Sequence, residues 1–321
     1  MTGVQTCALP ILFTITNDSR FAKKQDNRTH VPYNGEKYLT EQIESILNQR
    51  NVDVNILVRD DGSIDGTTAI LDNYSARSLL TWYQGANVGP ARSFLDLLRK
   101  APESEYYAFS DQDDYWNSEK MASASSKLKA MGDAPTLYIG QTQPADEQLR
   151  PLPIVAQQPL LTFGEALVHP YASGCTMVLN HALREVIVAH APHNLYMHDW
   201  WVVLVATAIG ARIAFDPEPH MAYRQHAANV IGEGESLVAE WKRRIHRFLN
   251  EQANTRSQMA AELKKACYEL MPAENRRLLD LFLAGKHSAS KRIRLCTSSD
   301  FRCNVKKTNS FFKIALVLNT Y

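Results

Sequence analysis

The chain has 321 residues, of which 45% are hydrophobic and 21% charged, and its formal net charge is +1. This composition suits one large α/β domain with a helical extension and excludes a disordered, collagen-like or coiled-coil architecture. The near-neutral charge gives no global signature of nucleic-acid binding. The longest apolar run, residues 200–211, holds about a dozen residues, fewer than the roughly 20 that a membrane-spanning helix needs.

The first 30 residues differ in character from the rest of the chain. Residues 1–11 resemble the translation of a sequencing adapter. They fit a signal peptide poorly, because no basic residue precedes their short apolar stretch and Pro10 interrupts it. We expect residues 1–30 to be artefactual or disordered, and the protein proper to begin near Val31.

From Val31 onward, the sequence pattern alternates between helices and strands. Helices are predicted over residues 39–47, 67–74, 118–131, 181–189 and 199–209, with another beginning at Pro90. Strands are predicted over residues 54–58, 79–83, 106–109, 137–140, 176–179 and 212–215. This alternation predicts an α/β fold with a mostly parallel, doubly wound sheet.

After residue 232 the pattern becomes almost wholly helical up to residue 285. We therefore place a domain boundary near residues 232–236. The predicted organisation is a catalytic-type α/β domain over residues 31–232 and a helical region over residues 233–321.

Two acidic clusters follow predicted strands. Residues 111–114 hold three carboxylates in four positions, and their mutual repulsion usually requires a cation or a hydrogen-bond network to offset it. Oxygen ligands of this kind suit Mg²⁺ or Mn²⁺, although a solvated turn that caps the next helix is equally compatible with the spacing. The second cluster, residues 59–65, could bind a base or a ribose hydroxyl, or could be an Asp-Gly turn with a helix cap.

Three further segments could carry chemistry. The loop over residues 85–92 enters a helix whose N-terminus attracts anions, and Arg92 adds a fork for phosphate. Asp199 precedes two tryptophans, so it is a candidate general base or a simple helix cap. Arg224 could neutralise a diphosphate and His226 could bind metal or phosphate, whereas the alternative for both is a polar loop.

In this order, the motifs resemble the family 2 glycosyltransferases of the GT-A fold, and in particular the rhamnosyltransferase-like members that build bacterial surface polysaccharides such as O-antigen. The resemblance extends over about 200 residues. It rests on residues 32–39, 45–49, 59–67, 87–89, 110–116, 173–176, 198–200 and 223–226. It implies a metal-dependent inverting enzyme that moves a sugar, such as rhamnose, from a nucleoside diphosphate sugar to a saccharide or lipid-linked acceptor.

The resemblance also implies roles for individual residues. Asp199 would be the catalytic base, and Asp113, Asp111 and His226 would bind Mg²⁺ or Mn²⁺. The acceptor would contact Gly174, Cys175 and Trp200. The donor nucleotide-sugar would contact Pro32, Tyr33, Asn34, Glu36, Asp60, Asp61, Asn87, Arg92, Asp111 and Arg224.

One feature departs from the family pattern. Family members carry a run of apolar β-formers just before the segment that corresponds to residues 32–34, whereas residues 26–30 here are polar. A buried central strand cannot be built from such residues. We predict that the chain lacks a proper first strand, with residues 12–15 partly taking its place. A degenerate, non-catalytic nucleotide-binding homologue is therefore the alternative to an active enzyme.

The C-terminal tail is basic and then apolar. Residues 286–313 contain eight Lys or Arg against one acid, Asp300, and residues 311–318 are largely apolar. This combination predicts either peripheral contact with an anionic membrane or a helix that covers the core. Five scattered cysteines without a C-x-x-C pair indicate reduced thiols, and we expect a cytoplasmic protein, peripheral on the inner face of the cell membrane if the tail binds lipid.

Overall fold

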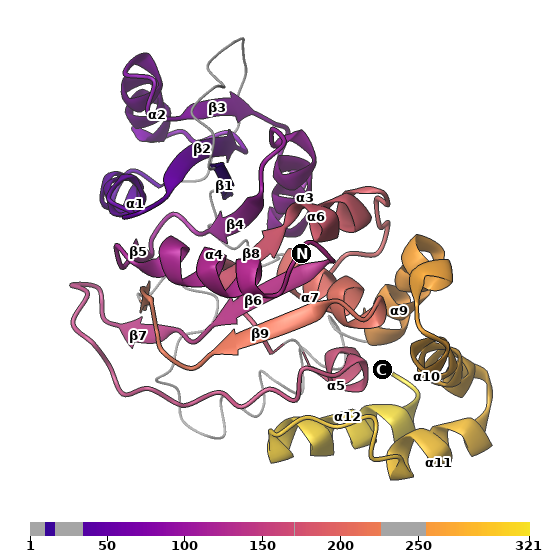
Figure 1. Cartoon of the computed structure of the whole chain (residues 1–321). Coiled ribbons are helices and arrows are strands. Elements are labelled where there is room, and N and C mark those ends of the chain that lie inside the picture. The colour runs from indigo at the N-terminus through magenta and orange to yellow at the C-terminus, as the bar shows by residue number, and fades with distance from the viewer. Residues whose placement is uncertain (1–9, 17–34, 170, 226–254) are drawn as a thin grey trace. The chain divides into compact units, whose positions relative to one another are not determined.

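The computed structural model describes residues 10–16, 35–169, 171–225 and 255–321 (Figure 1). These residues form two compact units. The first unit contains the described residues of 10–157, 172–188 and 212–225, and the second contains those of 158–171, 189–211 and 255–321. The boundary predicted near residues 232–236 lies outside the described residues.

The first unit is built on a sheet with the strand order β3-β2-β1-β4-β8-β6-β9. The strands are β1 (Ile11–Thr16), β2 (Asp53–Asp60), β3 (Thr81–Gln84), β4 (Tyr106–Ser110), β6 (Thr136–Gly140), β8 (Met177–Asn180) and β9 (Arg212–Asp216). The pairings give β2, β3, β4, β6 and β9 one direction, and β1 and β8 the opposite one. The predicted α/β class is therefore confirmed, and five of the seven strands share one direction in a mixed sheet, although the insertion of β1 and β8 makes four of the six neighbouring pairs antiparallel.

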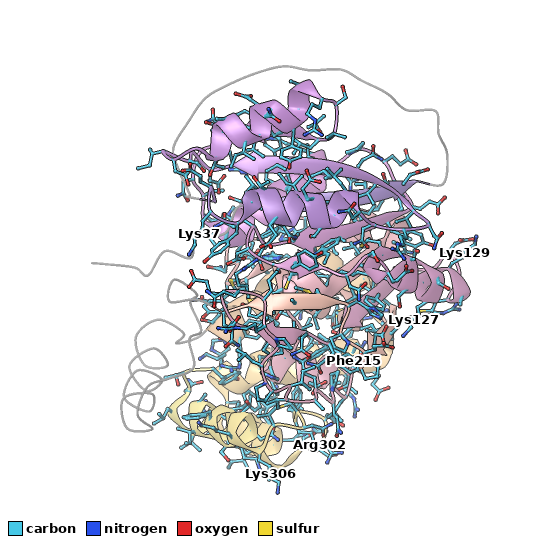
Figure 2. The ribbon with its side chains drawn as sticks, turned by 90° about the vertical axis from the view of Figure 1, so that its left-hand side faces the viewer. Lys37, Lys127, Lys129, Phe215, Arg302 and Lys306 are labelled. Atoms are coloured by element: carbon cyan, nitrogen blue, oxygen red, sulfur yellow. The ribbon has the colours of Figure 1, made fainter. Side chains whose placement is uncertain are left out.

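Helices of this unit follow the predicted positions closely. They are α1 (Leu39–Leu47), α2 (Thr67–Ala76), α3 (Pro90–Lys100), α4 (Lys120–Ala130) and α6 (His181–Val188). Each has an apolar face that the sheet can cover; α3, for example, buries Phe94, Leu97 and Leu98. Figure 2 shows Lys129 on α4, where it is exposed, whereas the ammonium of Lys127 on the same helix pairs with the carboxylate of Asp216 at 2.7 Å.

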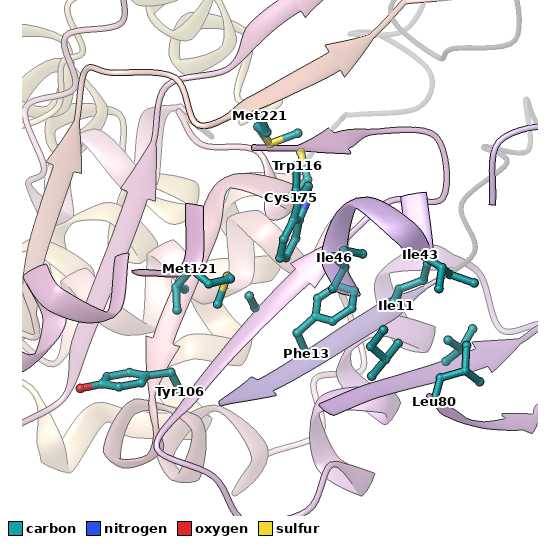
Figure 3. Close-up of a cluster of buried hydrophobic side chains, with 14 of the residues drawn as sticks. Ile11, Phe13, Ile43, Ile46, Leu80, Tyr106, Trp116, Met121, Cys175 and Met221 are labelled. Atoms are coloured by element: carbon teal, nitrogen blue, oxygen red, sulfur yellow. The ribbon is translucent and has the colours of Figure 1, made fainter. Parts of the chain in front are cut away.

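Strand β1 holds a central position that the sequence assigned only in part. It pairs antiparallel with β2 on one side and with β4 on the other. Ile11, Leu12 and Phe13 are fully buried, and the ring of Phe13 lies 4.7 Å from that of Trp116 (Figure 3). The expected replacement of the first strand by residues 12–15 is confirmed, whereas the exclusion of residues 1–30 from the fold is wrong for residues 11–16, because these apolar residues fill the gap between β2 and β4.

A second, small sheet lies after the acidic loop that follows β4. It consists of β5 (Tyr115–Trp116), β10 (Met221–Arg224) and β7 (Gln143–Ala145), with β10 in the middle. These short strands escaped sequence analysis, because two to four residues are too few to show a period. The helical turn η1 (Gly174–Thr176) leads into β8.

The second unit is helical in its described part. It contains α5 (Phe163–Val168), α7 (His198–Ala208), α9 (Thr255–Cys267), α10 (Ala273–Ala284), α11 (Ala289–Thr297) and α12 (Lys306–Leu318), with the turns η2 (Tyr268–Leu270) and η3 (Gly285–His287). Ten of the eleven residues of α7 are buried, so this helix forms the centre of the unit. None of the helices in the described part of the chain has the length and apolar character that a bilayer crossing requires.

Candidate active site

Two acidic loops follow the carboxyl ends of β2 and β4. Strand β2 ends at Asp60 and β4 at Ser110, and both run in the same direction with β1 between them. Their carboxyl ends therefore lie at one edge of the sheet, which is where open α/β sheets form their ligand crevices. The fold thus brings Asp60 and Asp61 to the same edge as Asp111 and Asp113.

The carboxylate of Asp60 shapes the turn after β2. It accepts hydrogen bonds from the backbone N–H groups of Gly62 and Ser63, each at 3.0 Å, and from the Ser63 hydroxyl at 2.6 Å. Gly62 has a φ of 99°, a conformation that residues with a Cβ rarely adopt. Asp60 is fully buried, and its contact with a base or ribose stays a prediction.

Asp61 connects β2 to α3. It is buried and accepts a hydrogen bond at 2.6 Å from Nε of Arg59 and another from the hydroxyl of Ser93. Arg59 also pairs with Asp96 and donates to the carbonyl of Ala86 at 2.6 Å. This network fixes the loop before α3 relative to the end of β2, and the nucleotide-binding role of Asp61 stays a prediction.

The loop before α3 carries two exposed residues of the predicted site. Oδ1 of Asn87 accepts a hydrogen bond at 3.1 Å from the N–H of Gly89, whose φ is 82°. Pro90 begins α3, and Arg92 lies in the first turn of the helix. The N-terminus of α3 therefore has the local geometry expected of an anion-binding helix end, and the contacts of Asn87 and Arg92 with a donor stay predictions.

Glu36 connects the loop before α1 to the start of α2. Its N–H donates to the carboxylate of Asp65 at 3.1 Å, and its own carboxylate accepts from the N–H of Gly66 at 2.9 Å. A Cβ at Gly66 would lie 2.6 Å from this carboxylate, so a larger residue there would displace the Glu36 side chain. Gly35 continues the link by donating its N–H to the Thr67 hydroxyl at 3.0 Å.

The acidic loop after β4 combines two half-buried carboxylates with a fully buried one. Asp111 and Asp113 are partly exposed, whereas Asp114 is only 1% exposed. Within the described residues, no nitrogen or oxygen donor reaches the carboxylate of Asp114, and the thiol of Cys175 is its polar neighbour. Burial, together with the charges of Asp111 and Asp113, raises the pKa of Asp114 well above its usual range.

Lys120 supplies a positive charge beneath this loop. Its side chain is almost fully buried, its Nζ donates to the carbonyl of Cys175 at 2.5 Å, and it lies 3.3 Å from the ring centre of Trp116. Burial lowers its pKa to about 7, while the charges of Asp114 and Asp111 oppose this shift. The repulsion among the three aspartates therefore has a counter-charge in the protein itself, in addition to any metal.

Arg224 is brought to the acidic loop by the small sheet. Met221 lies opposite Trp116 in the antiparallel pairing of β10 and β5, and this register, continued, puts Arg224 opposite Asp113. Accordingly, Nε of Arg224 donates to the carbonyl of Asp113 at 2.8 Å. Its guanidinium also pairs with the carboxylate of Glu41 and lies 4.6 Å from the ring centre of Tyr38. The fold thus joins Arg224 and Asp113, and neutralisation of a diphosphate by Arg224 stays a prediction.

The chemistry of this loop fits a divalent cation. Ligand atoms of Asp111, Asp114 and Cys175 all lie within 4.8 Å of one another, whereas within the described residues the predicted ligand Asp113 is not part of this cluster. Carboxylate oxygens are the preferred ligands of Mg²⁺ and Mn²⁺, and the buried oxygens of Asp114 have only the thiol of Cys175 beside them in the described part of the chain. Gly174 and Cys175, which were predicted to border the acceptor, are buried in η1.

Asp199 and Trp200 belong to the second unit. Asp199 lies in the first turn of α7, and its Oδ1 accepts a hydrogen bond at 2.6 Å from the N–H of Trp200. The indole N–H of Trp200 donates to the carbonyl of Ala166 at 2.7 Å, which fixes the buried ring. The roles of Asp199 as base and of Trp200 at the acceptor stay predictions.

Four predicted site residues lie outside the described residues: Pro32, Tyr33, Asn34 and His226.

Sequence analysis missed two residues at this site, Lys120 and Glu41, which contact the partners described above. A signal existed for Lys120 alone. It is the first residue of α4, where a cation is disfavoured by the helix dipole, so a lysine there calls for an acidic partner.

Comparisons with a family model and with curated relatives both point to glycosyltransferases. Residues 31–187 match the family model described as "Glycosyl transferase family 2". The chain is 28% identical over 229 residues to the dTDP-rhamnosyl transferase RfbG of Shigella flexneri, an alignment that covers 66% of this chain and 76% of RfbG.

Solved structures support the fold. The crystal structure of Staphylococcus aureus TarS residues 1–349 matches with a TM-score of 0.50 at 17% identity, covering 90% of each chain. GalNAc-T7 in complex with UDP, GalNAc and Mn²⁺ matches with a TM-score of 0.54 at 12% identity, covering 81% of this chain and 56% of that one. The chain is therefore a glycosyltransferase of the GT-A fold that is similar to glycosyl transferase family 2 over residues 31–187, which include both acidic loops.

Proposed function

We propose that this protein is a metal-dependent inverting glycosyltransferase of bacterial surface polysaccharide synthesis. It moves a sugar from a nucleoside diphosphate sugar to a saccharide or lipid-linked acceptor on the cytoplasmic side of the membrane. Rhamnose is the sugar to test first, because the relative RfbG is named a dTDP-rhamnosyl transferase.

The observation that carries this proposal is the convergence at the carboxyl edge of the sheet. The acidic loop with Asp111 and Asp113 lies at the same edge as Asp60, and Arg224 holds the backbone of Asp113. Carboxylates beside a fixed guanidinium suit a pocket for a diphosphate and its metal, since each charged partner can offset charge on the other.

The proposed donor site uses residues of the first unit. Asp111 and Asp113, with His226, would hold Mg²⁺ or Mn²⁺, which when bound neutralises charge on the leaving diphosphate. Mn²⁺ and UDP are bound by GalNAc-T7, a protein of the same fold, which supports testing this metal first. Arg224 would orient the diphosphate, and the remaining donor contacts would come from Glu36, Asp60, Asp61, Asn87, Arg92 and residues 32–34.

The proposed acceptor chemistry depends on Asp199. Its carboxylate would accept the proton of the acceptor hydroxyl as that oxygen attacks the sugar, and the hydrogen bond from the N–H of Trp200 would orient the side chain. Gly174, Cys175 and Trp200 would border the acceptor. Inversion at the sugar follows from a single displacement in which the base and the leaving group act on opposite faces.

The decisive experiment compares sugar transfer and donor hydrolysis by the parent and by Asp199→Asn, with a panel of nucleoside diphosphate sugars and Mn²⁺. Loss of a general base lowers turnover by about 10²- to 10⁴-fold. Asp72→Asn, an exposed position on α2, is the matched control and retains parental turnover. Chelation of the metal abolishes the parental activity, and added Mn²⁺ restores it.

Equal turnover by the parent and Asp199→Asn would rule out the proposed base. Binding of a nucleotide without any turnover by the parent would favour the alternative of a degenerate, non-catalytic homologue. The antiparallel strand β1 gives this alternative a specific basis, because it occupies the centre of the sheet directly beside β2 and β4, which carry the two acidic loops.

A further inference from the structure

Helix α12 buries one face and exposes another. Phe312, Ala315 and Leu316 form the buried face. At 3.6 residues per turn, the opposite side forms one continuous stripe. The stripe consists of Lys306, Lys307, Ser310, Lys313, Ile314, Val317 and Leu318, all exposed. It contains no acidic residue, and its lysines occupy the first two turns while its aliphatic residues occupy the last two.

The aliphatic part of this stripe is unusually open. Val317 is 75% exposed, Leu318 53% and Ile314 48%, and Val305, directly before the helix, is 46% exposed. Single exposed aliphatic residues are common, whereas a contiguous group on one helix face indicates an interaction site.

The buried face holds α12 in place before any partner binds. Phe312 stacks on Phe282 with ring centres 6.1 Å apart and planes 4° apart, and Tyr321 closes the cluster edge-on to Phe282 at 5.1 Å. The hydroxyl of Tyr321 donates to the carbonyl of Phe282 at 2.9 Å. The outer stripe is therefore rigid, so a partner does not have to order it on binding.

The surroundings of the stripe are strongly basic. Residues 286–321 contain eight Lys or Arg and one acid, Asp300. Arg302 and Lys306 project outward from this segment in Figure 2, and both are exposed. A positive field next to exposed aliphatic side chains is complementary to a surface that is anionic at its outside and apolar beneath.

We propose that the outer stripe of α12 docks on an anionic lipid bilayer. Ile314, Val317 and Leu318 enter the boundary between headgroups and acyl chains, and Lys306 and Lys313 contact the phosphates. The two sequence-based alternatives for the tail both hold, because one face of the same helix covers the core and the other faces outward. A nucleic acid would match the lysines but gives no partner to the aliphatic residues.

Co-sedimentation of the full chain with phosphatidylcholine vesicles, with and without phosphatidylglycerol, tests the proposal. We expect the protein to bind only the anionic vesicles. Added salt should weaken this binding, because it shortens the Debye length, which is about 10 Å at 0.1 M. Each lysine removed from the contact lowers the partition coefficient about fivefold. The double change Lys306→Gln with Lys313→Gln is therefore expected to lower it by more than tenfold.

Two further variants separate the contributions. Ile314→Ser with Val317→Ser removes exposed apolar surface only, so we expect weaker binding that salt still modulates. Arg99→Gln with Lys129→Gln removes two exposed charges from the first unit and keeps parental binding. Circular dichroism melts confirm that each variant is folded.

Three outcomes overturn the proposal. If anionic vesicles bind the Lys306 and Lys313 variant as strongly as they bind the parent, this stripe is not the contact with the membrane. Binding that survives in the lysine variant but is lost in the Arg99 and Lys129 variant moves the contact to the first unit. Binding of single-stranded DNA that depends on the lysines but not on Ile314 and Val317, without vesicle binding, identifies the stripe as a nucleic-acid site.

Discussion

The side chain with the most unusual environment is that of Lys120. A lysine ammonium is rarely buried unless it is paired. This one lies between the ring of Trp116 and the carbonyl of Cys175. The charges of Asp114 and Asp111 also act on it, since both raise its pKa. Its ammonium form, which is populated at and below about pH 7, gives the acidic loop a positive charge without requiring a metal. Burying that charge costs free energy, which the charges of Asp114 and Asp111 offset only in part.

The titration of Lys120 makes the cost of burying its charge measurable. Burial lowers its pKa from 10.5 to about 7 in the folded state, so between these values the unfolded chain holds a proton that the folded chain has released. Stability therefore rises with pH over this window, by up to about 1.4 kcal/mol per pH unit. The free energy of unfolding of the parent, measured by urea titration at pH 7, 8 and 9, should rise relative to that of Lys120→Met.

Lys129→Met provides the control for this titration. Lys129 is exposed on the same helix, so its replacement leaves the pH dependence of the parent unchanged. Parallel stability curves for the parent and Lys120→Met would contradict the buried titration. Because the measurement compares slopes, an overall loss of stability in Lys120→Met does not obscure the result.

At the scale of elements, sequence patterns predicted most helices and strands because each carries a periodic apolar face. Strand β2 and helix α3 are examples, with bounds close to those expected. The patterns identified β1 only in part, because its six residues precede a polar stretch and its direction depends on partners far along the chain. They failed at β5 and β10, so the contact between Arg224 and Asp113 emerged only from the fold.

Strand β1 is the element whose place in the sheet most needs a test. Phe13 is fully buried between Trp116 and the rest of the core, so Phe13→Ala leaves a cavity and is expected to lower the free energy of unfolding by about 3–5 kcal/mol. Ile64→Ala, at a side chain that is 82% exposed, is the control and changes it by less than about 0.5 kcal/mol. Urea unfolding of both variants gives the comparison, and a Phe13→Ala variant as stable as Ile64→Ala would show that β1 is absent from the folded sheet.

At the scale of the whole molecule, the residues predicted for the donor and for the base fall in different units. The donor residues Asp60, Asp111 and Arg224 belong to the first unit, and Asp199 belongs to the second. Sequence analysis identified these residues through the order of motifs along the chain, which carries information about a family's chemistry but none about distances. Charge partners such as Glu41 were missed, because nothing in a single sequence relates a residue on α1 to one on β10.

Ligand binding to the whole chain separates donor recognition from catalysis. A nucleotide that binds only the folded state adds about 2.7 kcal/mol to stability at a concentration 100 times its dissociation constant, which should raise the melting temperature by a few degrees. We expect dTDP or UDP to produce this shift with Mn²⁺ present, and a smaller one without it, since Asp111 and Asp113 repel an unaccompanied diphosphate. Asp113→Asn should show the same nucleotide-induced shift in melting temperature with and without Mn²⁺. Asp199→Asn should show the same shift as the parent, because it changes the base and not the donor site. If no nucleotide shifts the parent with Mn²⁺ at any concentration, the donor site is not formed in this chain and the antiparallel β1 is the element to rebuild first.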